Sequence, residues 1–460
     1  MALSLPDWNA LRDTIAGQVV LPDAAEYDVL RKPAMVRFHD ISPQAVVRCV
    51  TDADVAETVL FTRRFGLSTA IRSGGHSFAG RSSTTGVVID LGPMRSVSVA
   101  DGVVTVGAGT RLGELYDALD ARGLTVPAGC GPTVGIAGLT LGGGLGILGR
   151  SHGLTCDQLR RARVVLADGR IVECDEQHHP DLFWALRGAG AADIGVVTSL
   201  VFDPVPAPAA TGFHLVWPHA AAASTIEAWQ AWAPDAPDAL AASLFVHAGP
   251  DADRPPMVNV FGAMLASQSD TERLLDDLVA RTGLDPASTD LVTGSYREIK
   301  RYLVRVGEHM AGASNGRPVE PGLLYSKSEF FRRPLPPDVI AALVNNLVSG
   351  RSQGETRALD FSPWAGAYNR VSPDATAFAH RSERFLLKHD LELELGSSGE
   401  QIDAGRRWLS RSWSTVHPWG SGGVYPNFPD PELDDPDRAY YGSNADRLNR
   451  LRRRLAWPSF

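Results

Sequence analysis

The chain has 460 residues but only four cysteines, and no two of them form a CxxC pair: Cys49, Cys130, Cys156 and Cys174. This scatter argues against a zinc site or a disulfide framework. The sequence also lacks a basic surplus, because 53 acidic residues outnumber 44 lysines and arginines and leave a formal net charge of -9. Nucleic-acid-binding proteins usually carry a basic surface, so we expect no nucleic-acid partner.

Long hydrophobic runs are absent as well. No window of the sequence approaches roughly 18 consecutive apolar residues, so we expect no membrane span. The first twenty residues lack the basic start, apolar core and small-residue cleavage site of a signal peptide, and their pattern predicts an amphipathic helix. We therefore expect a cytoplasmic protein.

Glycine is plentiful, with 45 residues in the chain, and it is dense between about residues 45 and 205. The same region contains short strand-like runs at Val87–Asp90, Val97–Val99 and Val103–Val106, and helical spacing at Leu112–Arg122. Strands and helices mix here without the regular alternation of a doubly wound sheet. The pattern therefore predicts an α+β fold.

A proline-rich segment, Pro204 to Ala210, is the best domain boundary. Beyond it, strand-like runs at Ser243–His247 and Pro256–Met264 alternate with helices. The helix expected at Ser269–Thr282 has the spacing of a capping box between Ser269 and Glu272. A basic helix is expected from Asn444 to Leu455.

Two motifs resemble well-known functional patterns but lack the required context. Residues Gly144 to Gly149 match the G-x-G-x-x-G dinucleotide pattern, yet no buried strand precedes them, and the Ser151-His152-Gly153 segment would break the following helix. Residues 75–79 approach the G-x-S-x-G nucleophile elbow of serine hydrolases, but Ala79 stands where glycine is needed. Neither a Rossmann domain nor a serine hydrolase is therefore expected.

A third motif, Arg72-Ser73-Gly74-Gly75-His76-Ser77, follows the strand expected at Thr69–Arg72. Adjacent glycines allow consecutive backbone N–H groups to converge on an anion, and such a nest suits a pyrophosphate. A second glycine-dense stretch, Gly135 to Gly149, can supply further backbone donors to the same group. The occurrence of both stretches in one chain favours a phosphate-containing cofactor.

Six segments carry a resemblance to a known family: 67–92, 125–174 and 181–204 in the first half, and 327–336, Gly366–Arg381 and 424–433 in the second. Together they resemble the berberine-bridge-enzyme-like oxidases of the p-cresol methylhydroxylase and vanillyl-alcohol oxidase superfamily. The resemblance implies an FAD-binding domain of two parts at 1–205. It further implies a substrate-binding domain at 206–418, with an antiparallel sheet covered by helices, and a segment at 419–460 that returns to the FAD domain.

The same resemblance implies roles for individual residues. His76 falls on the histidine that bonds the 8α carbon of the flavin, and Tyr425 on a tyrosine that serves as catalytic base, with Asn427 as its companion. Val134 falls where a small side chain leaves room for dioxygen. The other implied cofactor-binding residues form the pyrophosphate loop (Arg72, Ser73, Gly74, Gly75 and Ser77), the second flavin loop (Thr133, Gly138, Gly142, Gly143 and Gly144) and a strand beside the adenine (Gly195 and Val197).

One departure from the family concerns a second flavin link. Relatives with two links carry Ala-Gly-x-Cys-Pro-Thr-Val-Gly, whereas this chain has Cys130 one residue earlier and Gly131 at the ligand position. A shift of one residue on an extended segment turns a side chain to the opposite side. We therefore expect attachment through His76 alone, with a β-bulge at the flanking glycines as the alternative that would restore a link through Cys130.

The expected function is that of an FAD-dependent oxidase. It would transfer a hydride from a small organic substrate, a hydroxylated natural product or a sugar, to covalently bound FAD, and dioxygen would reoxidise the flavin with release of hydrogen peroxide. Two alternatives remain at this point. One is a flavin-dependent monooxygenase or dehydrogenase on the same scaffold, and the other is a drug-binding resistance flavoprotein.

Overall fold

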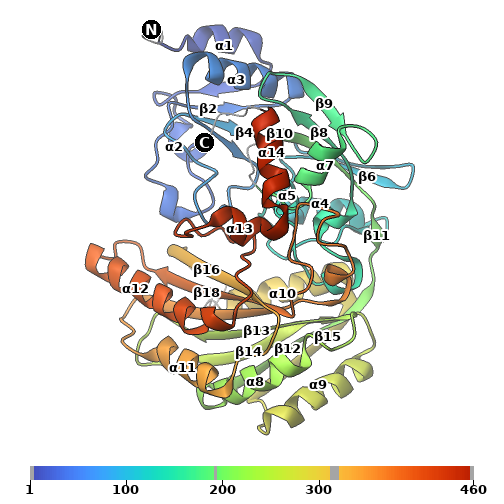
Figure 1. The fold of residues 1–460 in the computed structure, drawn as a ribbon, viewed down its shortest axis with the longest axis vertical. Helices are drawn as coiled ribbons and strands as arrows, with labels where there is room; N and C mark the ends of the chain where they lie inside the picture. The colour runs from blue at the N-terminus through green and yellow to red at the C-terminus, as the bar shows by residue number, and fades with distance from the viewer. Residues whose placement is uncertain (1–4, 191–193, 311–320, 456–460) are drawn as a thin grey trace.

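The computed structural model describes residues 5–190, 194–310 and 321–455. The chain forms two parts, shown one above the other in Figure 1: the first some 206 residues with the C-terminal helices, and a large sheet with its own helices. Helices and mainly antiparallel sheets occur in both parts. The α+β fold expected from the sequence is thereby confirmed.

The first sheet leads directly into residues 72–78, which we call the histidine loop because they contain His76. Its strands lie in the order β1 (Gln18–Val20), β2 (Ala45–Arg48), β4 (Val87–Asp90) and β3 (Thr69–Arg72). Strands β2 and β3 both run parallel to β4. Helix α3 (Asp52–Phe65) connects β2 to β3; it begins with a capping box at Thr51 and ends at Gly66 in the left-handed conformation. The chain therefore leaves β3 at Arg72 with a defined direction.

The second sheet is antiparallel, with the order β5 (Val97–Ala100), β6 (Val103–Gly107), β10 (Val196–Phe202), β8 (Leu159–Val165) and β9 (Ile171–Cys174). Strands β5 and β6 form one antiparallel hairpin and β8 and β9 form another. A two-stranded ladder joins β7 (Leu124–Thr125) to β11 (Val205–Pro206). Around these sheets lie α1 (Trp8–Thr14), α2 (Tyr27–Leu30), α4 (Leu112–Asp120), α5 (Ile136–Leu141), α6 (Gly149–His152) and α7 (Pro180–Leu186).

The large sheet has seven antiparallel strands, in the order β15 (Ser288–Ser295), β12 (Ala209–Pro218), β14 (Met257–Met264), β13 (Leu240–Ala248), β17 (Glu355–Pro363), β18 (Phe385–Leu393) and β16 (Leu323–Phe331). Strand β13, with the sequence LAASLFVHA, is buried at every second residue, because successive side chains point to opposite faces.

Helices cover the apolar face of this sheet: α8 (Ala222–Trp232), α9 (Gln268–Thr282), α11 (Pro337–Val348) and α12 (Gly399–Val416). On the opposite face, α10 (Tyr296–Met310) packs against β12 and β14. The half-buried residues of β13, β17 and β18 therefore point toward the first part of the molecule.

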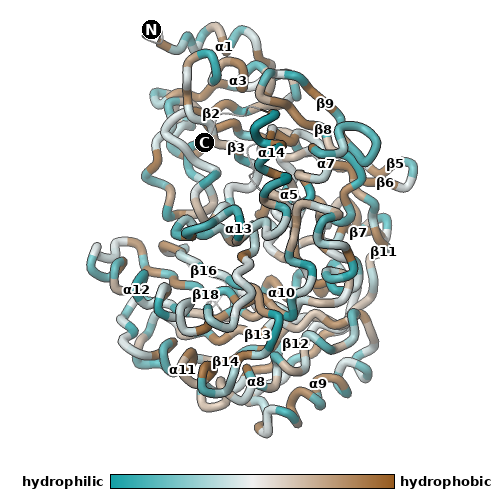
Figure 2. The backbone as a smooth tube through the Cα atoms, viewed as in Figure 1, coloured by the Kyte–Doolittle hydropathy of each residue, from teal (hydrophilic) through white to brown (hydrophobic). Residues whose placement is uncertain are grey.

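The C-terminal helices α13 (Pro436–Tyr441) and α14 (Ala445–Leu455) lie beside the first part, not the large sheet (Figure 1). Tyr440, Tyr441, Leu448 and Leu451 are buried in the same core as the first two sheets. Helix α14 is mostly hydrophilic (Figure 2), and its buried residues are Leu448 and Leu451. The chain thus crosses between the two parts twice.

One local prediction was wrong. The helix expected to be capped by Ser269 begins at Gln268, and the Oγ of Ser267 accepts the hydrogen bond from the Asp270 N–H at 3.2 Å. Ser267 takes this role because its backbone is extended, whereas Ser269 already lies in the first helical turn.

All four cysteines are free. Among the described residues, there is no group of His, Cys, Asp and Glu side chains that could hold a metal ion. In the same residues, no helix is long and apolar enough to cross a membrane.

Candidate active site

The two glycine-rich stretches meet backbone to backbone. A Cβ atom on Gly74 would lie 2.2 Å from the backbone nitrogen of Gly135, and one on Gly135 would lie 2.1 Å from the Ser73 Oγ. Any side chain at these positions would separate the loops. Gly75, with φ +75°, adopts a conformation that favours glycine and passes close to Pro33 and Ala34. The glycines are therefore required by the close approach of the two loops.

His76 lies at this junction, where its Nε2 is 3.0 Å from the Thr133 Oγ1 on the second loop. Burial and, to a smaller extent, the nearby charge of Arg111 lower the pKa of the half-buried imidazole. The neutral form is thus favoured near pH 7. A neutral imidazole has the free lone pair that a bond to carbon requires, so His76 is chemically suited to hold a cofactor covalently.

Most polar side chains of the histidine loop are used within the protein. The Arg72 guanidinium donates to the carbonyls of Leu30 at 2.6 Å, Arg31 at 2.8 Å and Ser82 at 3.0 Å. The Ser73 Oγ donates to the Ala108 carbonyl at 2.6 Å. These side chains shape the loop and do not extend from it.

Backbone groups remain available on the same loop. Within the described part of the chain, the N–H groups of residues 74–77 donate to no protein acceptor. A Cβ placed on Gly138 would meet no atom within 4 Å, so there is open space beside the second loop. Successive free N–H groups next to open space fit the pyrophosphate of a dinucleotide such as FAD.

Gly142, Gly143 and Gly144 contact side chains, whereas Gly74 of the histidine loop contacts the backbone of the second loop. A Cβ on Gly142 would lie 2.1 Å from the Asn427 Oδ1, one on Gly143 would lie 3.2 Å from the Phe378 ring, and one on Gly144 would lie 2.3 Å from the Thr155 Oγ1. The Asn427 Nδ2 donates to the Leu139 carbonyl at 2.9 Å. Gly142 therefore lets the distant 425–428 segment pack closely against the second loop, and Gly143 and Gly144 allow the same close approach of Phe378 and Thr155.

Tyr425 is buried at the centre of this contact. Its hydroxyl oxygen accepts hydrogen bonds from the Gly144 N–H at 2.9 Å, the Leu145 N–H at 3.0 Å and the Asn427 Nδ2 at 3.1 Å. Burial raises the pKa of Tyr425 to about 12, although these hydrogen bonds act in the opposite direction. The phenol is therefore protonated near neutral pH in the protein alone.

An aromatic cluster holds the Tyr425 ring. The rings of Phe330, Trp364 and Phe378 lie with their centroids 6.1 to 6.3 Å from it. Tyr368, stacked on Trp364, exchanges hydrogen bonds with Gly146: its hydroxyl accepts from the N–H at 3.2 Å and donates to the carbonyl at 3.1 Å. The second glycine loop is thus fixed by two tyrosines from the other half of the chain.

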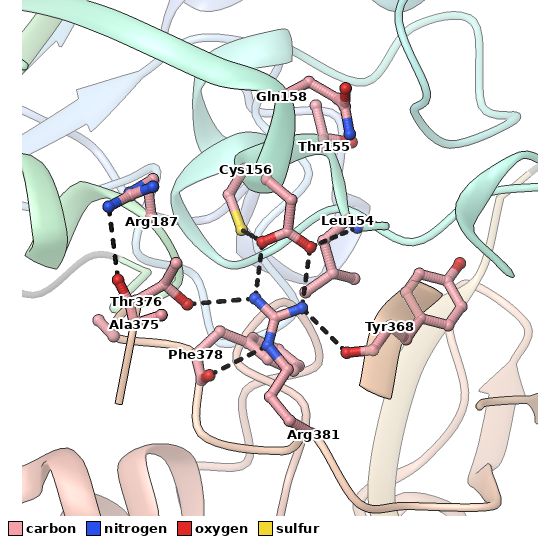
Figure 3. Close-up of polar contacts among 12 residues, drawn as sticks. Leu154, Thr155, Cys156, Gln158, Arg187, Tyr368, Ala375, Thr376, Phe378 and Arg381 are labelled. Atoms are coloured by element: carbon pink, nitrogen blue, oxygen red, sulfur yellow. Dashed lines mark hydrogen bonds and ion pairs between the residues drawn. The ribbon is translucent and has the colours of Figure 1, made fainter. Parts of the chain in front are cut away.

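A buried ion pair stabilises the same contact (Figure 3). The Arg381 Nη1 and Nη2 donate to the two carboxylate oxygens of Asp157 at 2.8 and 2.7 Å. The guanidinium also donates to the Tyr368 carbonyl at 3.2 Å and the Thr376 Oγ1 at 3.1 Å. Removing one partner of such a pair typically costs about 3–5 kcal/mol, because the other charge stays buried. The ion pair therefore holds the segment of residues 154–158 firmly against the segment of residues 366–381.

A group of charged residues that the sequence interpretation missed lies on the large sheet. Asp360 on β17 pairs in register with Lys388 on β18, and the Lys388 Nζ lies 3.4 Å from the Asp360 Oδ2 and 2.9 Å from the Asp390 Oδ2. Ser326 on β16 donates a short hydrogen bond to Asp390. Burial opposes the charge on Lys388, but Asp390 and Asp360 outweigh it and raise the pKa of the ammonium. We call Asp360, Lys388 and Asp390 the acid–lysine cluster.

This cluster faces the histidine loop. The Lys388 Nζ lies 4.8 Å from the ring centroid of Phe428 and 5.7 Å from that of Phe78, two residues after His76. Phe78 and Phe428 pack edge to face at 5.4 Å, and Phe428 in turn lies 5.0 Å from Tyr425. The histidine loop, Tyr425 and the acid–lysine cluster therefore border one region between the two parts of the protein.

Cys130 points toward the large sheet, where its thiol packs with side chains of α10. The Lys300 Nζ, on α10, lies 3.8 Å from the Cys130 Sγ and donates to the carbonyls of Ala128 at 3.0 Å and Gly129 at 2.9 Å. Burial lowers the pKa of Lys300, while Cys130 acts in the opposite direction. Lys300 was not identified from the sequence, because a single lysine on an amphipathic helix is usually exposed.

Gly195 and Val197 lie at the start of the central strand β10, next to β8. Val197 pairs with Val164, and Gly195 has a φ of +144° and approaches the same residue. Val134, next to Thr133 on the second loop, is half-buried, and its carbonyl accepts a hydrogen bond from the Leu112 N–H at 2.9 Å. These contacts place the remaining candidate residues in the same part of the molecule as the histidine loop.

Comparison with known proteins gives the following matches. A family model described as "FAD binding domain" matches residues 43–175. The FAD-linked oxidoreductase YgaK of Bacillus subtilis is 30% identical over 460 residues, covering 95% of this chain and 94% of the relative. Berberine bridge enzyme-like 18 of Arabidopsis thaliana is 30% identical, covering 81% and 70%. Xylooligosaccharide oxidase of Thermothelomyces thermophilus is 29% identical, covering 90% and 85%.

Solved structures show the same fold. Physcomitrella patens BBE-like 1 matches with a TM-score of 0.85 and 25% identity, covering 97% of this chain and 96% of that one. Glucooligosaccharide oxidase from Acremonium strictum, described as having a 6-S-cysteinyl, 8α-N1-histidyl FAD, matches with a TM-score of 0.84 and 23% identity, covering 97% and 96%. Both likenesses extend over nearly the whole length of the chain.

Proposed function

This chain belongs to the berberine-bridge-enzyme-like family of FAD-linked oxidoreductases, and we propose that it is an oxidase that holds its FAD through His76. The observation that carries the proposal is the convergence of three groups from distant segments: the histidine loop, Tyr425 and the acid–lysine cluster. An oxidoreductase needs a cofactor cradle and proton-transferring groups at one place, and this arrangement provides both.

FAD supplies the redox chemistry when bound, because its ring accepts a hydride from the substrate and passes electrons on to dioxygen. The free N–H groups of residues 74–77 would bind the pyrophosphate, and His76 would bond the flavin ring. The rings of Phe78 and Phe428 form an apolar wall that limits the access of water. A substrate hydroxyl beside this wall would lie near Tyr425 and Asp390, the two candidate proton acceptors. Lys388 holds the Asp390 carboxylate in a fixed position.

The substrate class we propose is a small hydroxylated organic molecule. Named relatives of the chain oxidise substrates of this kind, including xylooligosaccharides. The test is an oxygen-electrode measurement on the purified flavoprotein with a panel of hydroxylated natural products and sugars. An oxidase consumes one dioxygen and releases one hydrogen peroxide for each substrate molecule oxidised. Reduction of a dye without oxygen uptake would instead show a dehydrogenase, and binding without turnover would show a drug-binding flavoprotein.

Val134 is proposed to leave room for dioxygen at the flavin. Replacing Val134 with isoleucine adds one methylene group beside the second loop, which should slow reoxidation of the reduced flavin and leave its reduction by substrate nearly unchanged. Stopped-flow absorbance of the reduced protein mixed with air-saturated buffer measures this step. Val134→Ala serves as the control, since a smaller side chain should not slow the reaction. Equal reoxidation rates in the parent and the isoleucine variant would place the oxygen site elsewhere.

The flavin should have one covalent link. Cys130 packs against α10 and Lys300, so Cys130→Ala should leave a flavin attached to the His76 peptide alone, as in the parent. A Cβ on Gly131 would meet only Val134 Cγ2, at 3.0 Å, so Gly131→Cys should fold and place a thiol at the position used by relatives with two links. Mass spectrometry of the flavin-bearing peptides should then show a flavin joined to both peptides only in the Gly131→Cys protein. A parent flavin crosslinked to Cys130 would show that a bulge restores the second link.

A further inference from the structure

A cavity of about 230 Å³ opens beside the acid–lysine cluster. It lies where edge strand β16, helix α12 and the 429–432 segment meet the short helix η1 (Val36–Phe38) and Phe78 of the histidine loop. Its lining includes Arg37, Phe78, Tyr325, Ser326, Lys327 and Arg406. Ser326 also donates a hydrogen bond to Asp390, so one lining residue of the cavity directly contacts a residue proposed to act on the substrate.

Most charges in this cavity neutralise one another. The Lys327 Nζ lies 2.8 Å from the Asp430 Oδ2 and 2.9 Å from the Glu432 Oε2. The Arg406 Nη2 lies 2.6 Å from the Glu432 Oε1. Two basic side chains thus pair with two acidic ones. The remaining charge of the lining is the positive charge of Arg37.

Arg37 is half-buried and has no carboxylate partner among the described residues. Its Nη1 donates to the Leu324 carbonyl at 3.1 Å. The guanidinium carbon lies 4.3 Å from the ring centroid of Tyr325 and 4.7 Å from that of Phe38. Burial lowers the pKa of Arg37 and the positive charge of Arg406 acts in the same direction, whereas Tyr325 and Glu432 oppose this change. Only Nη1 of this guanidinium donates to a protein acceptor among the described residues, so Nε and Nη2 stay available to bind a carboxylate with two parallel hydrogen bonds.

We propose that Arg37 is a specificity-determining residue that binds a carboxylate of the substrate, and that the substrate is a small aromatic acid. The aromatic part is inferred from the rings of Phe78 and Tyr325 and from the apolar Leu409, Pro429 and Pro431 in the lining. With its carboxylate on Arg37, such a molecule extends past Ser326 toward Asp390. This inference rests on the proposed oxidase function and adds the chemical class of the substrate.

Calorimetric titration of the FAD-containing protein with benzoate and with benzamide tests the inference. The two probes share one ring, but only benzoate is charged, and the ionic strength is held constant because salt screens such contacts. The parent should bind benzoate about 10- to 100-fold more tightly than benzamide, the gain expected for a hydrogen-bonded charge. Arg37→Gln should abolish this preference, and Arg37→Lys should keep part of it.

Arg64→Gln is the matched control. Arg64 is also stacked on an aromatic ring, with its guanidinium carbon 5.4 Å from the Phe65 centroid, but it lies on the exposed side of α3. This variant should bind both probes like the parent. The inference is overturned if the parent shows no preference for benzoate, if neither probe binds at millimolar concentration, or if Arg37→Gln retains the preference. Absence of oxygen uptake with every substrate, together with an intact Arg37-dependent preference, would instead contradict the oxidase proposal alone.

Discussion

His76→Ala protein should lose all acid-resistant flavin. The imidazole of His76 is the proposed point of covalent attachment, and its neutral form is favoured because burial lowers its pKa. Without the imidazole, the contacts of the pyrophosphate loop remain, so FAD should still bind but should dissociate when the protein is denatured. Flavin absorbance in the supernatant after acid precipitation, and flavin fluorescence in a denaturing gel, measure the two states. We expect all of the flavin to stay with the parent protein after acid precipitation, and none to stay with the His76→Ala protein.

Two further variants control this experiment. His178→Ala removes an exposed histidine far along the chain and should keep the flavin fully attached. Thr133→Val removes the hydroxyl 3.0 Å from the His76 Nε2 and should slow attachment without preventing it. Acid-resistant flavin in the His76→Ala protein would refute the assignment of His76 as the link.

Tyr425→Phe should slow reduction of the flavin by substrate about 10²- to 10⁴-fold, the range typical of losing a general base. Burial raises the pKa of Tyr425 to about 12, so roughly one molecule in 10⁵ has an ionised phenol at pH 7. The parent rate should therefore rise about tenfold for each pH unit above neutrality, and Tyr425→Phe should lose this dependence. Anaerobic stopped-flow measurements across the pH range give both results.

The phenylalanine variant also leaves the N–H groups of Gly144 and Leu145 without an acceptor, which costs about 1–3 kcal/mol for each unpaired group, whereas the Asn427 Nδ2 keeps the Leu139 carbonyl. Tyr441→Phe is a matched control, because this buried tyrosine donates a hydrogen bond to the Ala189 carbonyl at 2.9 Å and is not part of the contact between Tyr425 and the acid–lysine cluster. It should lower stability but keep the rate and its pH dependence. If Tyr425→Phe retains the pH dependence and Asp390→Asn loses it, the proton acceptor is Asp390.

Local elements were largely predictable because local rules decide them. The strand at Thr69–Arg72 has the bounds expected, and the basic C-terminal helix begins at Ala445, one residue from the expected start. The rejected dinucleotide motif is likewise preceded by the short helix α5 and not by a strand. Hydrophobic periodicity and turn residues act over a few neighbouring positions, so the sequence shows them directly.

Contacts between segments far apart in the sequence could be predicted less well from the sequence. Asp157 and Arg381 are 224 residues apart in the sequence. Taken alone, each is a charged residue of the kind usually found on a protein surface. The acid–lysine cluster forms because the register of β17 and β18 places Asp360 beside Lys388. Alternating charged residues at 388, 390 and 392 were a signal for a polar face on that strand. Nothing in the sequence showed which surface this face would meet.

The sequence by itself determined the α+β class, the glycine loops and the histidine between them, because glycine spacing and strand patterns are local properties. The tertiary structure alone decided that Tyr425 meets Gly144, that Cys130 lies against Lys300, and that Arg37 has no acidic partner among the described residues. These contacts depend on strand register and on packing between segments hundreds of residues apart. Burial then sets the charge state of each group, and burial exists only once the chain has folded.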